Sequence, residues 1–253
     1  MDLGLKGKKA VVIGATKGIG LATAEALAAE GCDLAICARS EDAVNATVES
    51  LLRRGIKATG ASVDAADGDA LKAWVAAAGE ELGGIDIIVP CPSAGGGKVD
   101  EEGWKLNLEV DVLGTTRAIE AAMPYLTQSD SASIVCIGTS AAVEEFAAPQ
   151  TYNAMKGALI VHAQQLALAV AAQGIRVNVV SPGPIYFDGG DWDFIKNNME
   201  DFYNATIAKQ PFGRLGSGEE VANAIAFLAS PAASWITGVN LMVDGGITKR
   251  VQL

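Results

Sequence analysis

Short apolar segments and longer helical patterns alternate along almost the whole sequence, and this order limits the folds that the chain can adopt. The short segments are apolar on both faces, which is typical of buried parallel strands, whereas the alanine-rich stretches between them indicate helices. Strands joined through helices form right-handed crossovers, so the strands lie parallel in one sheet with helices on both faces. The sequence therefore predicts a doubly wound parallel α/β fold. The predicted strands are KAVVIGA, DLAICAR, KATGASVD, DIIVPC, SIVCIGT, RVNVVSP and VNLMVD, and the predicted helices cover 19–30, 41–54, 67–82, 105–127, 151–173 and 218–229.

A single domain, 1–253, accounts for the chain. Half of the 253 residues are hydrophobic, which suffices for one large buried core. We find no internal repeat, low-complexity tract or linker in the sequence. An aromatic and acidic insertion at about 186–213 interrupts the alternation of strands and helices.

Charge and hydropathy argue against two kinds of partner. The formal net charge of -11 opposes nucleic-acid binding, because phosphate groups need a basic face. No apolar run approaches the ~18 residues of a membrane span, and MDLGLKGKKAVVIG leads into a strand-like segment rather than a signal sequence. We therefore expect a cytoplasmic protein that binds neither nucleic acid nor membrane.

The four cysteines lie in or beside apolar segments, with no CxxC pair and no cluster with histidine. This placement is typical of small core residues, and it indicates neither a disulfide nor a metal site. They are Cys32, Cys37, Cys91 and Cys136.

The first predicted strand runs into a glycine-rich turn that opens a helix, VVIGATKGIGLATAEALAAEG, with Gly14, Gly18 and Gly20. Such a turn lets backbone N–H groups and the helix N-terminus face a pyrophosphate, and Gly20 allows the helix to approach the strand closely. Its position at the first strand-to-helix junction predicts a Rossmann-type dinucleotide site.

The end of the second strand indicates which dinucleotide is bound. An acidic residue there would bind both ribose hydroxyls, but the sequence has Ala38, Arg39 and Ser40. Lys17 adds a cation near the same ribose, so a 2′-phosphate would find charge-assisted partners. We favour NADP(H) over NAD(H); the alternative is that Lys17 and Arg39 are solvated surface charges. Asp64 follows the third strand and either accepts a hydrogen bond from the adenine amino group or caps the next helix.

Tyr152 and Lys156 are four residues apart in TYNAMKG, at the start of a predicted helix. Positions i and i+4 project from the same helix face, so the phenol and the ammonium can serve one reacting atom. Spacing alone leaves two interpretations open: an acid-base pair, or the first turn of a buried helix.

Taken together, these motifs make the sequence similar to the short-chain dehydrogenase/reductase family, nearly from end to end. GATKGIG resembles the glycine motif of that family, YNAMK its YxxxK motif, and RVNVVSPGPI the strand that leads to its PG motif. GRLGSGEEVANAIAFLASPAASWITGVNLMVDGG resembles its C-terminal signature. The occurrence of all these motifs in this order makes the resemblance specific.

The resemblance implies a catalytic set. Tyr152 would exchange the proton, and Lys156 would stabilise its phenolate, since a phenol with a pKa near 10 is a poor acid and base at neutral pH. The family's usual spacing to the tyrosine falls on Thr139, with Ser140 beside it; one would position the substrate oxygen and the other would serve a turn or helix cap. Asp111 stands where the family has a catalytic Asn, and it can supply the same backbone carbonyl to a water chain serving Lys156. The implied cofactor contacts are Gly14, Thr16, Lys17, Gly18, Ile19, Gly20, Arg39, Ser40, Asp64, Cys91, Tyr152, Lys156, Pro182, Gly183 and Ile185.

Three departures from the family pattern stand out. Ile13 replaces the usual Thr before the first glycine, which removes a hydroxyl that would brace the turn. PCPSAGG, with Cys91 and Ser93, replaces the NNAG run. Asp111 replaces Asn and brings a carboxylate into the neighbourhood of Lys156.

The insertion at 186–213 lies where the family places its substrate-covering loop and helix. Glu144 and Glu145 either flank the pocket mouth, where they would favour a polar or cationic substrate, or belong to a solvated loop. His162 lies on another side of the predicted helix from the Tyr152 pair, so we expect packing or a subunit interface there. The aromatic residues that either line a lid or simply pack are Trp192, Phe194, Phe202 and Tyr203.

The sequence thus predicts an NADP(H)-dependent oxidoreductase that interconverts a ketone or aldehyde and an alcohol by hydride transfer, with Tyr152 as acid and base. The resemblance implies a homotetramer built partly through the helix of Tyr152. One alternative is an NAD(H)-dependent dehydrogenase. A second is a non-catalytic dinucleotide-binding regulatory protein, which the altered PCPSAGG and Asp111 favour. A third is a lyase on the same scaffold, which would not need the glycine-rich turn and Lys156.

Overall fold

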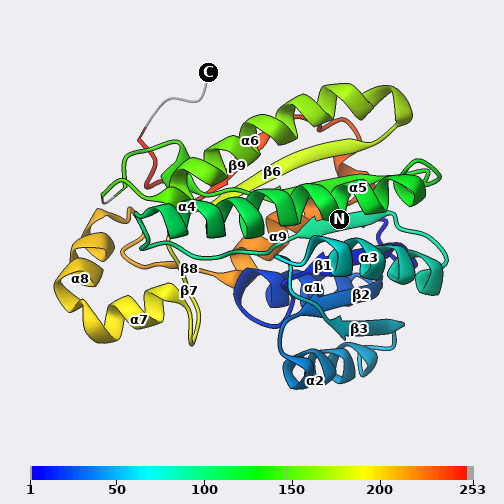
Figure 1. Ribbon diagram of the computed structural model, residues 1–253, viewed down its shortest axis with the longest axis horizontal. Coiled ribbons are helices and arrows are strands. Elements are labelled where there is room, and N and C mark those ends of the chain that lie inside the picture. The colour runs from blue at the N-terminus through cyan, green and yellow to red at the C-terminus, as the bar shows by residue number, and fades with distance from the viewer. Residues whose placement is uncertain (1, 147, 250–253) are drawn as a thin grey trace.

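The computed structural model describes residues 2–146 and 148–249. Its centre is one sheet of seven strands, all parallel, in the order β3-β2-β1-β4-β5-β6-β9 (Figure 1). This confirms the doubly wound, Rossmann-type single domain. The strands are β1 (Lys9–Ile13), β2 (Asp33–Ala38), β3 (Ala58–Ser62), β4 (Ile87–Pro90), β5 (Ser133–Ile137), β6 (Arg176–Pro182) and β9 (Asn240–Val243).

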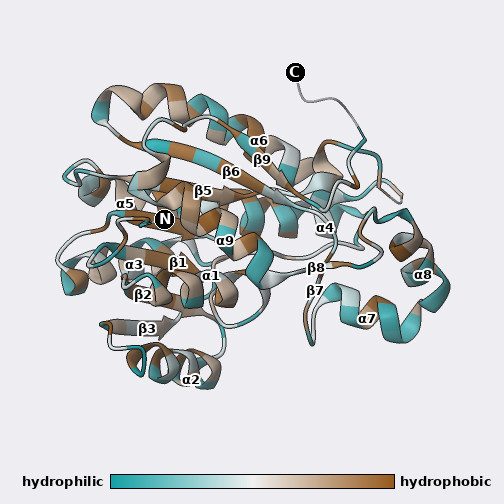
Figure 2. Ribbon diagram, turned by 180° about the vertical axis from the view of Figure 1, so that it is seen from behind, coloured by the Kyte–Doolittle hydropathy of each residue, from teal (hydrophilic) through white to brown (hydrophobic). Residues whose placement is uncertain are grey.

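Helices cover both faces of this sheet and divide the core in two. Val12 of β1 packs with Leu27 and Ile225 on the face covered by α1, α2 and α9. Its neighbour Val11 packs with Val75 on the face covered by α3, α5 and α6. Apolar residues follow the central strands accordingly (Figure 2). The helices are α1 (Gly18–Ala29), α2 (Glu41–Leu52), α3 (Gly68–Leu82), α4 (Glu101–Asn107), α5 (Gly114–Leu126), α6 (Thr151–Val170), α7 (Asp191–Asn198), α8 (Glu200–Lys209) and α9 (Gly218–Ala229).

Two sequence predictions need correction. The edge strands β3 and β9 are only partly buried, because each has a neighbouring strand on one side only. The helix predicted over 105–127 begins earlier, at Glu101, since the Asp100 carboxylate caps it by accepting a hydrogen bond from Gly103 N at 2.9 Å. It then passes through a π-helical segment, Leu108–Leu113, before α5.

The strand order reverses between β1 and β4, which places a binding crevice beyond the carboxyl ends of these strands. β1 pairs with β2 on one side and with β4 on the other. In doubly wound sheets, ligands bind where the order reverses in this way. The insertion after β6 carries α7 and α8 outward at one end of the molecule (Figure 1) and joins the short parallel pair β7 (Ile185–Tyr186) and β8 (Gly216–Ser217).

Helix α6 is more apolar than expected, because we found no apolar run in the sequence that approaches the length of a membrane span. Within the described residues, the helical run Thr151–Gln173 is long and apolar enough to match a membrane span by length and composition. In the fold it packs against β6 and carries the buried Lys156. Its inner face therefore serves the protein core, and its outer face stays exposed in the single chain.

The cysteines occupy the places expected of small core residues. Cys32, Cys37 and Cys136 are buried, and Cys91 is partly buried. Burial raises the pKa of each of the three buried thiols to about 12, so they stay protonated at neutral pH. All four are free cysteines.

Candidate active site

Tyr152 and Lys156 lie one turn apart at the start of α6, and they share a face of that helix. The Lys156 Nζ lies 5.7 Å from the centre of the Tyr152 ring. The helix begins just after the loop that follows β5, and Lys156 reaches back to donate a hydrogen bond to the last carbonyl of that strand, Ile137 O, at 3.0 Å. The pair therefore stands at the carboxyl end of the sheet, beside the crevice.

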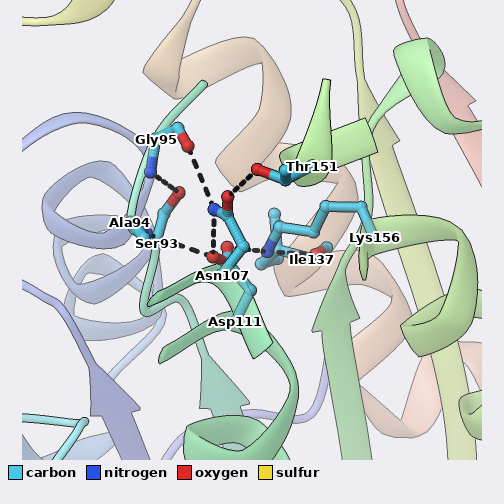
Figure 3. A network of polar contacts seen from close by, with 8 residues as sticks. All are labelled: Ser93, Ala94, Gly95, Asn107, Asp111, Ile137, Thr151 and Lys156. Carbon is cyan, nitrogen blue, oxygen red and sulfur yellow. Dashed lines mark hydrogen bonds and ion pairs between the residues drawn. The ribbon is translucent and has the colours of Figure 1, made fainter. Parts of the chain in front are cut away.

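Lys156 is buried and charged. It is only 2% exposed, and its Nζ lies 3.2 Å from Asp111 Oδ1 (Figure 3). Burial alone disfavours the ammonium, but the opposing effects, of which the negative charge of Asp111 is the largest, outweigh it and leave the pKa of Lys156 above its ordinary value. The lysine is thus held as an ammonium beside the phenol.

Asp111 comes from the π-helical segment and is fully buried. Its Oδ2 accepts hydrogen bonds from Asn107 Nδ2 at 3.0 Å and from Ala94 N at 3.2 Å (Figure 3). A buried carboxylate is stable only when it is paired and hydrogen-bonded, and Asp111 has both kinds of partner. π-Helical turns are often found at functional sites, and this one carries the residue that contacts Lys156.

The Tyr152 phenol has a pKa above its ordinary value, and the causes oppose one another. Burial raises the pKa most, and the Lys156 ammonium lowers it. The carboxylates of Asp111 and Asp191 raise it further, and a hydrogen bond with the Ser93 hydroxyl lowers it. The phenol therefore stays protonated at neutral pH in the free protein, and its pKa depends on the surrounding charges.

Thr139 and Ser140 follow β5, and one of the two hydroxyls caps a turn. Thr139, not Ser140, caps the short 3₁₀ turn Ser140–Ala142, because its Oγ1 accepts a hydrogen bond from Ala141 N at 3.3 Å. Ser140 is nearly buried at 8% exposure, whereas Thr139 is half-buried. The sequence left open which of the two hydroxyls serves as the cap, and in the structure it is Thr139. Which hydroxyl holds a substrate oxygen stays a prediction.

The glycine-rich turn fits an anion. A Cβ on Gly14 would lie 2.9 Å from Cys91 O, and one on Gly20 would lie 2.1 Å from Gly14 O, so only glycine allows this close packing. No side chain caps the first turn of α1 within the described residues. Its free N–H groups and the positive end of the helix suit the pyrophosphate of a dinucleotide.

The two cations predicted to meet a 2′-phosphate, Lys17 and Arg39, are both exposed. Neither forms an ion pair in the part of the chain that the structure describes. Ser40 caps α2, its Oγ accepting from Ala43 N at 3.4 Å.

Asp64 does not cap the helix that follows β3, which was one of its two predicted roles. Asp67 is the cap of α3, with its Oδ1 accepting from Ala70 N at 3.0 Å. Asp64 instead closes a turn by accepting from Ala66 N at 3.0 Å.

The remaining predicted cofactor residues lie near the carboxyl end of the sheet. Gly183 N donates to Val243 O at 3.0 Å, and Pro182 is paired with the same residue of β9. Ile185 is buried in β7, and Cys91 follows the end of β4 and lies against Gly14. Thr16 and Ile19 flank the tight part of the glycine-rich turn, and both are half-buried.

Aromatic side chains join the insertion to the loop before α6. Trp192 stacks on Phe202 at 6.0 Å between ring centres, and Phe146 meets both edge-on at 6.1 and 6.2 Å. The ring centres of Tyr203 and Trp192 are 6.4 Å apart. Phe194, in contrast, is 62% exposed. Three of the four aromatic residues named from the sequence therefore pack in one cluster, and Phe146, which the sequence did not single out, joins them from the loop of Glu144 and Glu145.

Other residues of the site were not predicted. Asn107 and Thr151 are buried and hydrogen-bonded to each other, and the Phe187 ring lies against the glycine-rich turn, 2.7 Å from where a Cβ on Gly18 would be. A polar residue four positions before Asp111, on the same helix face, was the available signal for Asn107. His162 is exposed on the outer side of α6, away from the site.

Dinucleotide-dependent oxidoreductases combine an anion-binding turn at the reversal point of a parallel sheet with a proton-transfer group beside it, and this chain is of that class. Comparison with known proteins makes the assignment specific. The profile of a family described as enoyl-(acyl carrier protein) reductase matches residues 14–248. The chain belongs to the short-chain dehydrogenase/reductase family, and it is an oxidoreductase acting on CH–OH or carbonyl groups.

Three relatives illustrate the similarity. Isoepoxydon dehydrogenase of Penicillium expansum is 36% identical over 255 residues, covering 98% of this chain and 97% of that protein. The 3-oxoacyl-(acyl-carrier-protein) reductase of Vibrio cholerae is 33% identical over 251 residues, covering 97% and 99%. The crystal structure of L-sorbose reductase from Gluconobacter frateurii, complexed with NADPH and L-sorbose, has a TM-score of 0.91 at 30% identity and covers 99% of this chain and 100% of that chain. A nicotinamide dinucleotide is thus the class of cofactor for this site.

Proposed function

We propose that the protein is an NADP(H)-dependent oxidoreductase that interconverts a small ketone or aldehyde and the corresponding alcohol. The observation that carries the proposal is the Tyr152 phenol beside a buried Lys156 ammonium, which Asp111 and the Ile137 carbonyl hold in place. A proton donor and a fixed positive charge at the carboxyl end of the sheet are what carbonyl reduction requires of a protein.

The side chains divide the proton chemistry among them. A bound nicotinamide supplies hydride to a carbonyl carbon or accepts it from an alcohol. Tyr152 gives its proton to the substrate oxygen in reduction and takes it back in oxidation. Lys156 stabilises the phenolate, while Thr139 or Ser140 positions the substrate oxygen. Asp111 keeps Lys156 charged and in place.

The preference for NADP(H) rests on charge at the far end of the crevice. Arg39 and Lys17 are exposed and free of ion pairs within the described residues, and no carboxylate ends β2. Arg39→Asp should weaken NADPH binding strongly and NADH binding little, because it repels the 2′-phosphate and offers an acceptor to the ribose.

Isothermal calorimetry with both cofactors tests this preference. Arg53→Asp is the matched control, because it makes the same charge change at the other end of α2. Tighter binding of NADH than of NADPH to the wild-type protein would contradict the preference. Equal losses of NADPH affinity in Arg39→Asp and Arg53→Asp would show that Arg39 does not contact the cofactor.

The substrate we propose is a small carbonyl compound. One relative is named a dehydrogenase of isoepoxydon, and another is a reductase of L-sorbose that was crystallised with this compound. A panel of L-sorbose, cyclohexanone and an acetoacetyl thioester, with the alcohol of each for the reverse direction, separates a sugar, a plain ring and an acyl chain. NADPH oxidation with at least one member supports the function, and no turnover of any carbonyl or alcohol would count against it.

We further propose a cytoplasmic homotetramer in which 186–213 covers the substrate. The tetramer is supported by the outer face of α6, where Leu168 is 83% exposed and Val161 is 55% exposed. The covering role is supported by the aromatic cluster that ties α7 and α8 to the loop leading to Tyr152.

A further inference from the structure

A buried amide connects three separate segments of the site. Asn107 is 2% exposed, and its Oδ1 accepts a hydrogen bond from Thr151 Oγ1 at 2.5 Å. Its Nδ2 donates to Gly95 O at 3.1 Å and to Asp111 Oδ2 at 3.0 Å (Figure 3). The side chain thus uses both of its N–H groups and its oxygen. It joins the loop after β4, the end of α4 and the first residue of α6.

The same amide fixes the carboxylate that faces the lysine. Asp111 Oδ2 has two N–H donors, Asn107 Nδ2 and Ala94 N, and Asp111 Oδ1 faces Lys156 Nζ at 3.2 Å. With Oδ2 held from two directions, the carboxylate has one orientation, in which Oδ1 points to Lys156. The contact between Asp111 and Lys156 is a direct ion pair between side chains.

Both members of the Tyr152–Lys156 pair depend on this connection. Thr151 precedes Tyr152 directly and is 2% exposed, and its hydroxyl also lies 3.2 Å from Lys98 O. Asn107 therefore fixes the start of α6 on one side and the partner of Lys156 on the other. Small displacements of reacting groups can lower rates by as much as about a hundredfold, so an anchor common to both groups is functionally relevant.

We propose that Asn107, with Thr151, is a positioning residue of the active site that sets both the place of Lys156 and the electrostatic field at the Tyr152 phenol. The inference rests on the proposed function, because it assumes that Lys156 serves Tyr152 in proton transfer. Neither residue touches substrate or cofactor in this role. Asn107 acts through Asp111, and Thr151 acts through Asn107.

The direction of the effect follows from charge. The Asn107 N–H dipole offsets part of the Asp111 negative charge, which itself raises the pKa of Tyr152. In Asn107→Leu, which keeps a similar volume but removes the donors, the carboxylate is less offset. The apparent pKa of the phenol should then rise. Alcohol oxidation needs the phenolate, so the rise of its rate with pH should move to higher pH.

The test is the pH dependence of alcohol oxidation by the full-length protein with NADP⁺, using the panel member that the wild type turns over fastest. We expect Asn107→Leu to lower kcat on the order of tenfold or more, to move the pH profile upward and to leave the Michaelis constant for NADP⁺ unchanged. Thr151→Val should also lower kcat and move the pH profile upward, but to a smaller degree. Thr151→Ser, which keeps the hydroxyl, should restore the wild-type profile.

Thr115→Val is the matched control. Thr115 is also fully buried, and its hydroxyl has no hydrogen-bond partner among the residues described. This variant makes the same chemical change one turn beyond Asp111 without touching the network, and its profile should match the wild type. Should Asn107→Leu fail to fold, the Thr151→Val and Thr151→Ser pair decides the matter.

Unmoved pH profiles in Asn107→Leu and Thr151→Val, with an active wild type, would overturn the positioning role and leave the proposed function intact. The positioning role is likewise overturned if Thr151→Ser fails to restore the profile that Thr151→Val shifts. A wild type without turnover on any panel member would overturn the proposed function, and this inference with it.

Discussion

Asp111 shows how one side chain can change the chemistry of a familiar motif. An asparagine at this position would be neutral, whereas the Asp111 carboxylate lies 3.2 Å from Lys156 and raises the pKa of both Lys156 and Tyr152. Favouring the ammonium and opposing the phenolate are two effects of the same negative charge. We therefore expect the pH range of activity to depend on this residue.

We expect Asp111→Asn to lower the apparent pKa of alcohol oxidation, because the negative charge that opposes the phenolate is removed. The rate should then begin to rise at lower pH than in the wild type, which is opposite to the shift expected for Asn107→Leu. Glu109→Gln is the control, since Glu109 lies in the same segment but pairs with Arg117 at the partly exposed surface. A profile that stays in place in Asp111→Asn would show that the carboxylate has no effect on the phenol.

The two hydroxyls after β5 can be separated by substitution. Thr139→Val keeps the shape but removes the hydroxyl, and we expect turnover to fall on the order of a hundredfold, as for loss of one transition-state hydrogen bond. Ser140→Ala should leave turnover within a few-fold. Steady-state kinetics of both variants is the measurement. Turnover lost in Ser140→Ala and kept in Thr139→Val would give the role to Ser140.

At the scale of the residues, the sequence predicted those site residues whose chemistry depends on their spacing along one helix. Tyr152 and Lys156 were found because four positions along a helix bring side chains to one face. Asn107 and Thr151 were missed because they are 44 positions apart and meet only through the fold. The cap after β5 could not be assigned to one of the two hydroxyls, since which of two adjacent side chains turns toward Ala141 N depends on the backbone of that turn.

At the scale of the elements, α7 and α8 stand out because few of their residues are buried. No residue of α7 is fully buried, and in α8 only Thr206 is. Trp192 and Phe202 stack on each other, and both meet Phe146, in the loop before α6, edge-on. If the proposed covering role is right, this low burial should let the segment open and close as ligands enter and leave.

We expect Trp192→Ala to raise the Michaelis constant for the carbonyl substrate about tenfold, because aromatic pairs are each worth ~0.5–1.5 kcal/mol beyond their buried area. Cofactor affinity should stay close to that of the wild type. Phe194→Ala, two residues further along α7 and outside the cluster, is the control and should have little effect. Equal kinetics in the two variants would mean that the cluster does not hold a substrate cover.

The boundaries of most helices followed from the sequence pattern, and the exceptions have physical causes. The start of α4 was missed because EEGWK contains two acids and a glycine, and the Asp100 cap compensates for its weak apolar pattern. The π-helical segment Leu108–Leu113 could not be predicted, since it changes the hydrogen-bond step without changing the composition.

At the scale of the whole molecule, the exposed apolar face of α6 suggests that the single chain is incomplete. Leu168, at 83% exposure, and Val161, at 55%, lie on the outer side of the helix whose inner side carries Lys156. The proposed tetramer would bury this face against another copy, which would account for an α6 that is as apolar as a membrane span while it packs against β6.

We expect Leu168→Glu to reduce the size of the assembly, because it places a charge where subunits would bury an apolar surface. Light scattering after size-exclusion chromatography measures the change. Leu52→Glu, on α2 at the far edge of the sheet and 48% exposed, is the control and should keep the wild-type mass. A monomeric wild type, or a tetramer unaffected by Leu168→Glu, would contradict an interface through α6.

The fold as a whole could be predicted from the sequence because the seven strands of the main sheet and most of the helices around it are signalled locally, and the crossovers have one hand. The sequence did not predict the electrostatic field inside the site. That field depends on groups that the fold brings together from the loop after β4 and from α4, β5 and α6. Tyr152 is the group on which that field acts.

The most direct measurement is therefore the turnover of Tyr152→Phe, which removes one hydroxyl and keeps the ring that faces Lys156. NADPH oxidation is followed with the panel substrate that the wild type reduces, and NADPH affinity is measured in parallel by calorimetry. We expect turnover to fall about 10²- to 10⁴-fold, the usual contribution of general acid catalysis, with NADPH affinity and thermal stability close to the wild type. Turnover within a few-fold of the wild type would contradict the assignment of Tyr152 as the proton donor.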